Sequence, residues 1–142
     1  MTTYYTNEAA FDLPDLDLTD VTTHQLAVKL DDGAMPSLTV ARNELPEGGS
    51  IAEAVEANLR RATIELRAHK LIGRREIQIG GVPAVEVATE WIDDKGEGVY
   101  TRQVHFAFGE TWMTLAVNGP LGEREKCDAV IEEVEGTFRL RE

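Results

Sequence analysis

Five segments of this chain alternate between apolar side chains and small or polar ones with a period of two residues. That period is typical of β-strands that bury one face only. The segments are Val21–Leu30, Ser37–Asn43, Pro83–Asp93, Tyr100–Phe108 and Thr111–Asn118. A sheet built from them has one apolar face, which can pack against helices, and one face of small and polar side chains. The second face is poorer in Lys and Arg than an ordinary solvated face, so we expect it to receive a partner.

The assignment of residues to the two faces follows from the hydropathy of each strand. Along Pro83–Asp93 it places Val85, Val87 and Trp91 on the apolar face and Glu86, Ala88 and Glu90 on the polar face. In the other strands the polar face receives Thr23, Gln25, Ala27, Ser37, Thr39, Ala41, Thr101, Gln103, His105, Ala107, Trp112, Thr114, Ala116 and Asn118.

Turn and capping signals set the order of the elements. Gly80-Gly81 and Gly109-Glu110 are predicted hairpin turns, and Leu71–Ile79 is a further strand. Ser50 and Glu53 form a capping box, which predicts a helix of about 16–19 residues. Apolar spacing predicts a second amphipathic helix from about Glu123.

The order of these elements is three strands, a helix, four strands and a helix, with the first strand an edge strand around Phe11 that leads into an acidic connector. No βαβ alternation occurs. We therefore predict one α+β domain over residues 1–142: a mostly antiparallel, curved sheet with two amphipathic helices on its apolar face.

Composition excludes several classes of partner. The formal net charge is −12 over 142 residues, which argues against nucleic acid and anionic membrane surfaces. No segment has the length of a transmembrane helix, and the N-terminus does not have the pattern of a signal peptide. Cys127 is the only cysteine, so an intrachain disulfide is impossible. A cytoplasmic protein is expected.

Catalytic motifs are not found in the sequence. The three histidines and Cys127 lack metal-ligand spacing, and neither serine lies in a nucleophile elbow. His105 and Glu90 on neighbouring strands could form either an acid–base pair or an ordinary cross-strand contact. We expect no enzyme activity, no metal and no cofactor.

Two amides have both a structural and a functional interpretation. Asn58 lies within the apolar stripe of the first helix, where it either bonds a neighbouring backbone group or is held for a partner. Gln103 either meets water or donates to a docked segment. In the second case Gln103→Ala weakens binding while folding barely changes.

The order of elements resembles one specific group. Together with the start Tyr4-Tyr5-Thr6-Asn7-Glu8-Ala9-Ala10-Phe11-Asp12-Leu13-Pro14, the strand Pro36–Arg42 and Arg102-Gln103-Val104, it is similar to the Eag-type chaperones of type VI secretion effectors, within the DcrB-like, PsbP-like fold. The resemblance implies a cytosolic homodimer that holds the apolar N-terminal helices of an effector. It also implies that Ser37, Asn58 and Gln103 contact the partner. At the position of a second serine in the family, this chain has Ala41.

The partner-binding residues expected on the polar face and the first helix are Gln25, Ala27, Ser37, Thr39, Ala41, Asn58, Thr101, Gln103, His105 and Thr114. They favour a chaperone or adaptor that shields an apolar segment of a partner protein. The alternative is a small-ligand carrier or weak hydrolase that uses Glu90, Gln103 and His105 in a closed pocket. A purely structural domain is the third possibility.

Overall fold

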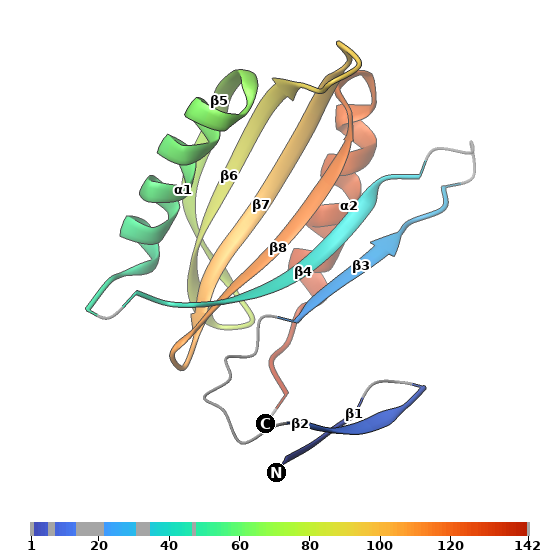
Figure 1. Ribbon diagram of the computed structural model, residues 1–142. Coiled ribbons are helices and arrows are strands. Elements are labelled where there is room, and N and C mark those ends of the chain that lie inside the picture. Colours follow the sequence, from blue (N-terminus) through green and yellow to red (C-terminus); the bar gives the residue numbers. More distant parts are fainter. Residues whose placement is uncertain (1, 6–7, 14–21, 31–34, 47, 142) are drawn as a thin grey trace.

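The computed structural model describes residues 2–5, 8–13, 22–30, 35–46 and 48–141. The elements, in chain order, are β1 (Thr2–Tyr5), β2 (Ala10–Leu13), β3 (Thr23–Ala27), β4 (Ser37–Glu44), α1 (Ile51–Glu65), β5 (Arg67–Ile79), β6 (Val82–Ile92), β7 (Gly98–Phe108), β8 (Thr111–Pro120), a 3₁₀ turn (Leu121–Glu123) and α2 (Arg124–Thr137) (Figure 1). The predicted acidic connector over residues 14–20 and the predicted turn at 31–33 lie outside the described residues.

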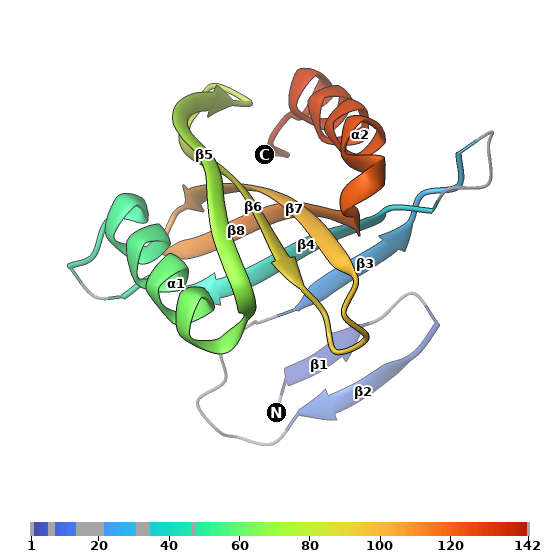
Figure 2. The same ribbon diagram turned by 90° about the horizontal axis from the view of Figure 1, so that it is seen from above.

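Six strands form one antiparallel sheet in the order β3-β4-β8-β7-β6-β5. The predicted α+β class with an antiparallel sheet is confirmed. The strand predicted around Phe11 is instead part of a separate hairpin, in which β2 pairs with β1, and Phe11 lies opposite Tyr4. This hairpin lies apart from the six-stranded sheet (Figure 1, Figure 2) because β2 finds its hydrogen-bond partner locally.

The two helices pack on opposite faces of the sheet, so the prediction that both cover one face is wrong. Helix α2 contributes Cys127 and Ile131 to the main core, whereas α1 contributes Val55 to a smaller cluster with Val85 and Val87. The main core consists of Ile79, Ala84, Tyr100, Val104, Phe106, Leu115, Val117, Cys127 and Ile131. Figure 2 shows α1 and α2 on either side of the sheet.

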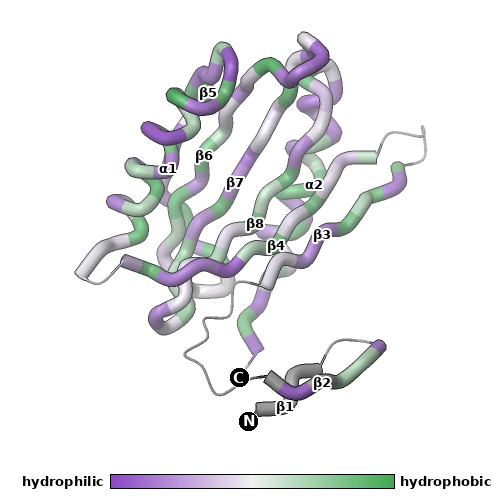
Figure 3. The backbone as a smooth tube through the Cα atoms, viewed as in Figure 1, coloured by the Kyte–Doolittle hydropathy of each residue, from purple (hydrophilic) through white to green (hydrophobic). Residues whose placement is uncertain are grey.

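The two faces of strand β6 are the reverse of those predicted from the sequence. Val87 lies opposite Gln103 and Glu86 opposite Val104, and paired residues point to the same side of a sheet. Val85 and Val87 therefore share the polar face of β7, where α1 covers them, and Glu86 faces α2. Because β6 is covered on both sides, the hydropathy of its residues does not distinguish the side that faces α1 from the side that faces α2. Figure 3 colours the backbone by the hydropathy of each residue, and hydrophobic and hydrophilic residues are interspersed along the strands.

Local signals explain the ends of α1. The Ser50 hydroxyl accepts a hydrogen bond from the backbone N–H of Glu53 at 3.2 Å, as the capping box predicts. The helix is 15 residues long and ends earlier than expected, because Leu66 is already extended and Ala68 adopts a positive φ of 53°. The chain thereby turns directly into β5, which begins before the predicted Leu71–Ile79 strand.

A buried cluster of charges holds α2 against the sheet. The Arg102 guanidinium lies 3.1 Å from Glu86 Oε2, 3.0 Å from Asp128 Oδ1 and 3.1 Å from Glu132 Oε1. Burial acts against its charge, yet the hydrogen bonds that Arg102 donates to these carboxylates outweigh that effect and raise the pKa of Arg102. The Tyr100 hydroxyl donates to Asp128 at 2.5 Å. Burial and this bond raise the pKa of Tyr100 to about 12.

Two carboxyl groups of this cluster, Glu86 and Glu135, have pKa values displaced in opposite directions. Glu86 Oε2 and Glu135 Oε1 are buried atoms that lie 3.1 and 3.5 Å from the Arg102 guanidinium, and neither makes a well-aligned hydrogen bond within the described part of the chain. Burial, together with the neighbouring Glu86 carboxylate, raises the pKa of Glu135 to about 8. Burial alone would raise the pKa of Glu86, but hydrogen bonds from Glu135, Arg75 and Arg102 lower it. Glu135 is therefore the protonated partner at neutral pH.

Among the described residues, no helix combines the length and the hydropathy that a membrane crossing requires.

Candidate functional site

The predicted partner-binding residues come together on one side of the sheet. By register, Gln25 lies opposite Thr39, Ala27 opposite Ser37, Ala41 opposite Thr114, and both Ser37 and Thr101 opposite Asn118. Gln103 and His105 point to the same side, opposite Ala116 and Thr114. We call the surface formed by Gln25, Ala27, Ser37, Thr39, Ala41, Thr101, Gln103, His105 and Thr114 the polar face. None of these nine side chains is an acid, a lysine or an arginine.

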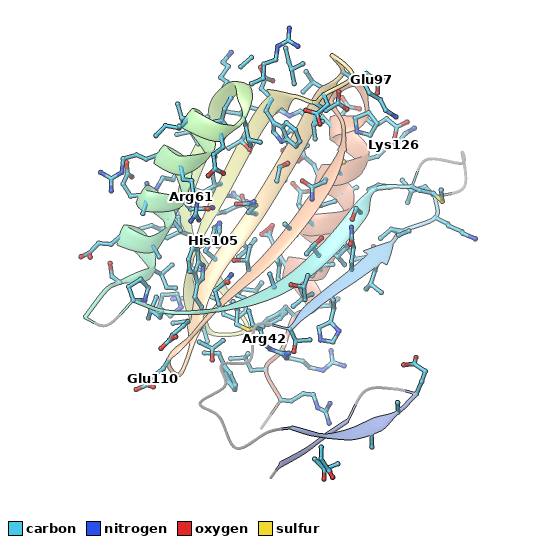
Figure 4. The ribbon with its side chains drawn as sticks, viewed as in Figure 1. Arg42, Arg61, Glu97, His105, Glu110 and Lys126 are labelled. Atoms are coloured by element: carbon cyan, nitrogen blue, oxygen red, sulfur yellow. The ribbon has the colours of Figure 1, made fainter. Side chains whose placement is uncertain are left out.

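Helix α1 forms a wall beside the polar face. Asn58, the tenth predicted residue, lies on this helix, and the helix and strands enclose an open groove of about 530 Å³. The groove is lined by Ala41, Asn43, Glu44, Asn58, Arg61, Gln103, His105, Trp112 and Thr114. Arg61 of α1 and His105 of β7 lie next to each other on this side of the sheet (Figure 4). We refer to this hollow as the α1 groove.

His105 lies at the centre of a hydrogen-bonded cluster in the floor of the groove. Its side chain is 1% exposed. Nδ1 accepts from the indole Nε1 of Trp112 at 3.0 Å and lies 3.1 Å from the Thr114 hydroxyl, while Nε2 lies 2.9 Å from Gln103 Oε1. Burial, aided by the charge of Arg74, lowers the pKa of His105 to about 4. The ring is therefore neutral at pH 7.

Gln103 is therefore not a free surface amide. Its oxygen faces the buried Nε2 of His105, so truncation to alanine leaves a buried ring nitrogen without its partner. Such a loss costs on the order of 1–3 kcal/mol of stability. The expectation that Gln103→Ala would barely affect folding is revised accordingly, although the residue does lie on the face away from the main core.

Asn58 lies half-buried at the groove and is held by its own helix. Arg61 Nη2 donates to Asn58 Oδ1 at 3.0 Å. The amide oxygen of Asn58 therefore has a partner within the protein, and its NH₂ group is left for the groove. The structure thus gives Asn58 a side-chain partner where a backbone partner was expected, and its role toward a partner protein stays a prediction.

The proposed pair of His105 and Glu90 is not assembled. Glu90 lies opposite Tyr100 in the register, on the side of the sheet that α2 covers, whereas His105 is on the polar face. The error has the same origin as the inversion of β6. A hydrolase that combined Glu90, Gln103 and His105 would need groups from opposite faces of the sheet. Among the described residues, no group of three His, Cys, Asp or Glu side chains is placed to hold a metal ion.

The outer part of the polar face carries two further polar contacts. Thr101 donates to Asn118 at 2.5 Å and accepts from the indole of Trp91 at 3.4 Å, so Trp91 belongs to this face and not to the apolar one. At the exposed edge, Gln25 Nε2 donates to the Ser37 hydroxyl at 3.3 Å. Thr101 is buried, whereas Gln25 is exposed to solvent.

Four residues that line the groove were not among the predicted partner-binding residues: Asn43, Glu44, Arg61 and Trp112. Trp112 was placed on the polar face by its alternation with Met113, and the signal that distinguishes it is its indole N–H, the only ring donor on that strand. Arg61 lies three residues after Asn58, which is a neighbouring position on a helix surface.

A model of the DcrB family matches residues 8–133 of the chain. No curated protein matches it in sequence. Among solved structures, the crystal structure of PA94 from Pseudomonas aeruginosa, a protein of unknown function, aligns with a TM-score of 0.82 at 21% identity and covers 99% of this chain and 97% of that one.

Two further structures are more distant. LpqN of Mycobacterium tuberculosis, which is involved in cell envelope biogenesis, aligns with a TM-score of 0.58 at 13% identity, over 87% of this chain and 80% of its own. The solution structure of the cyanobacterial PsbP (CyanoP) of Synechocystis sp. PCC 6803 aligns with a TM-score of 0.55 at 9% identity, over 92% and 98%. At these identities the likeness shows the fold alone, and it confirms the expected PsbP-like architecture.

Proposed function

Since this chain belongs to the DcrB family and carries nine uncharged residues of β3, β4, β7 and β8 on one side of its sheet, beside a helical wall, we propose that it is a non-enzymatic chaperone that shields an apolar, transmembrane-like segment of a partner protein. The observation that carries the proposal is the polar face itself. Nine strand positions that point to one side present only Ala, Ser, Thr, Gln and His.

The chemistry of this face suits an apolar helix. Helices in membranes associate through close packing of small residues and through hydrogen bonds from polar side chains. Ala27, Ala41 and Thr39 offer small side chains, and Gln103 offers an amide beside them. The α1 groove supplies a wall along which a helix can lie.

The resemblance to the Eag-type chaperones narrows the client to the N-terminal apolar helices of a type VI secretion effector. The same resemblance carries the remaining parts of the proposal, a homodimer that acts in the cytoplasm. Light scattering after size exclusion measures the dimer directly.

The test is co-expression with such an effector segment fused to a soluble reporter protein. We expect this chain to raise the soluble yield of the fusion and to co-purify with it. Ala41→Arg places a long cation in the groove and should abolish co-purification, because burying an unpaired charge against an apolar helix is costly.

Ala129→Arg is the matched control, since Ala129 is exposed on α2 on the other side of the sheet. It should co-purify like the wild type. If the wild-type chain leaves the soluble yield of the fusion unchanged, the chaperone proposal is wrong. If both arginine variants bind equally well, the client lies elsewhere on the molecule.

A further inference from the structure

The two amides of the α1 groove both have their oxygen atoms occupied from within the protein. Gln103 Oε1 lies 2.9 Å from His105 Nε2, and Asn58 Oδ1 accepts from Arg61 at 3.0 Å. A carboxamide has one accepting and one donating end. With the accepting ends held, the ends left for a ligand are the NH₂ groups.

The direction of the hydrogen bonds at Gln103 follows from Trp112. An indole N–H only donates, so His105 Nδ1, at 3.0 Å from it, must be the bare, accepting nitrogen. A neutral imidazole with a bare Nδ1 carries its proton on Nε2. That proton points at Gln103, whose carbonyl oxygen must face it. A rotated amide would bring two donors together in a buried place.

Burial keeps this arrangement in one state. His105 is 1% exposed, and contacts from Gln103, Trp112 and Thr114 surround its two ring nitrogens. Water therefore does not compete for either ring nitrogen. The pKa of His105, lowered to about 4 chiefly by burial, keeps the ring neutral at pH 7.

We propose that Trp112 and His105 are positioning residues that fix Gln103 as a hydrogen-bond donor, so that the α1 groove selects a segment by the acceptors it presents. The inference deepens the proposed function and rests on it. The acceptors of an apolar helix are its backbone carbonyl oxygens, each of which retains a second lone pair after the helical hydrogen bond. The groove then reads the backbone of its client and tolerates many apolar sequences.

The first arm of the test needs no ligand. Long-range ¹H–¹⁵N NMR correlation of the wild-type protein reads the tautomer of His105 from its two ring-nitrogen shifts. We expect the Nε2–H tautomer. Trp112→Phe keeps an aromatic ring but removes the donor, and the spectrum should move toward a mixture of tautomers. A residue with a purely structural role would leave the tautomer unchanged.

The second arm measures binding of a synthetic apolar helical peptide of about 20 residues in detergent micelles. Gln103→Glu keeps the oxygen that faces His105 but removes the NH₂ group, and Gln103→Met removes both without adding charge. Both should weaken binding by roughly tenfold, the effect of one lost buried hydrogen bond. Trp112→Phe should weaken it by about two- to threefold through looser positioning. Gln78→Glu, an exposed change on β5, is the matched control for charge and should bind like the wild type.

The outcomes separate the two proposals. An Nδ1–H tautomer in the wild-type protein overturns the positioning role whatever the binding data show. If the wild type and Gln103→Glu bind the peptide equally, the donor role of Gln103 is overturned while the chaperone function stands. If the wild type does not bind the peptide, the proposed function and the choice of client acceptor fail together, and the tautomer still decides the roles of Trp112 and His105.

Discussion

Arg102 and Glu86 form an ion pair of 3.1 Å inside the interface between the sheet and α2, with side chains only 8% and 6% exposed. Neither residue contacts the polar face, and each comes from a different strand. Arg102 also reaches Asp128 and Glu132 of α2, so the attachment of α2 depends on these charges as well as on the apolar side chains around Cys127 and Ile131.

Replacing Arg102 with methionine should destabilise the protein strongly. The variant keeps much of the side-chain bulk but leaves Glu86 and Asp128 without their shared cation, and removing one partner of a buried pair costs about 3–5 kcal/mol. Urea denaturation measures the loss. Arg60→Met, on the exposed side of α1, is the matched control and should change the free energy of unfolding by less than about 0.5 kcal/mol. Equal midpoints for the two variants would contradict this account of the cluster.

Glu135 should make stability fall as the pH rises. Its pKa is raised from 4.5 to about 8 by burial and by Glu86, so the unfolded chain releases this proton before the folded protein does. The contribution is fully present below pH 4.5 and is lost progressively up to about pH 8, with a slope of at most about 1.4 kcal/mol per pH unit.

The comparison for Glu135 is between urea midpoints at pH 6 and pH 8.5. Wild-type protein should lose about 1–2 kcal/mol more over this interval than Glu135→Gln, which cannot ionise. Glu86, whose pKa is lowered, acts in the opposite sense and only at acidic pH. Parallel pH profiles for wild type and variant would show that Glu135 does not keep its proton at neutral pH in the folded protein.

His105 should make stability fall as the pH drops. Its pKa is lowered from 6.5 to about 4, chiefly by burial and further by Arg74, so the unfolded chain takes up a proton that the folded protein excludes. The contribution is fully present above pH 6.5 and is lost between pH 6.5 and 4, up to about 3 kcal/mol in total. Denaturation at pH 7 and pH 5 should show a steeper loss for wild type than for His105→Gln. Identical slopes would place the titration elsewhere.

Gly119→Ala should be destabilising, and a change at Cys127 should relieve it. A Cβ at position 119 would lie 2.6 Å from the Cys127 Sγ atom, closer than real contacts allow, and overpacking of this kind costs about 1–3 kcal/mol. In the double variant Gly119→Ala/Cys127→Ala the sulfur is gone, so the two effects should be less than additive. A double-mutant cycle by thermal or urea denaturation measures the coupling, and strict additivity would refute the contact.

The sequence predicts the strands well where only one face is covered. In β4, β7 and β8 the alternation assigns each residue to the correct side, because the apolar side chains of these strands gather in or against the main core and the polar ones lie on the other side. Strand β6 fails for a physical reason: α1 covers one side of it and α2 the other, so both parities are buried. The placement of α1 depends on tertiary packing that local periodicity does not encode.

The candidate site shows the same division. The nine predicted strand residues share one side of the sheet because a period of two is enough to group them, whereas Asn58 joins them only because α1 packs on that side. The orientation of the Gln103 amide could not be predicted from the sequence. It depends on the indole N–H of Trp112, which can only donate and which fixes the tautomer of His105. Likewise, Arg102 and Glu86 resemble surface residues in the sequence, and only the register brings them under α2.

The placement of α1 and α2 on opposite sides of the sheet bears on how this chain can evolve. The residues that hold the domain together under α2 and the residues that line the α1 groove alternate along the same strands without sharing side chains. Successive side chains of a strand point to opposite sides of the sheet, so exposed groove positions that make no buried hydrogen bond can change with little effect on the core under α2. Descendants of this chain can therefore exchange one binding preference for another by drift on one surface, while purifying selection on the other preserves the domain.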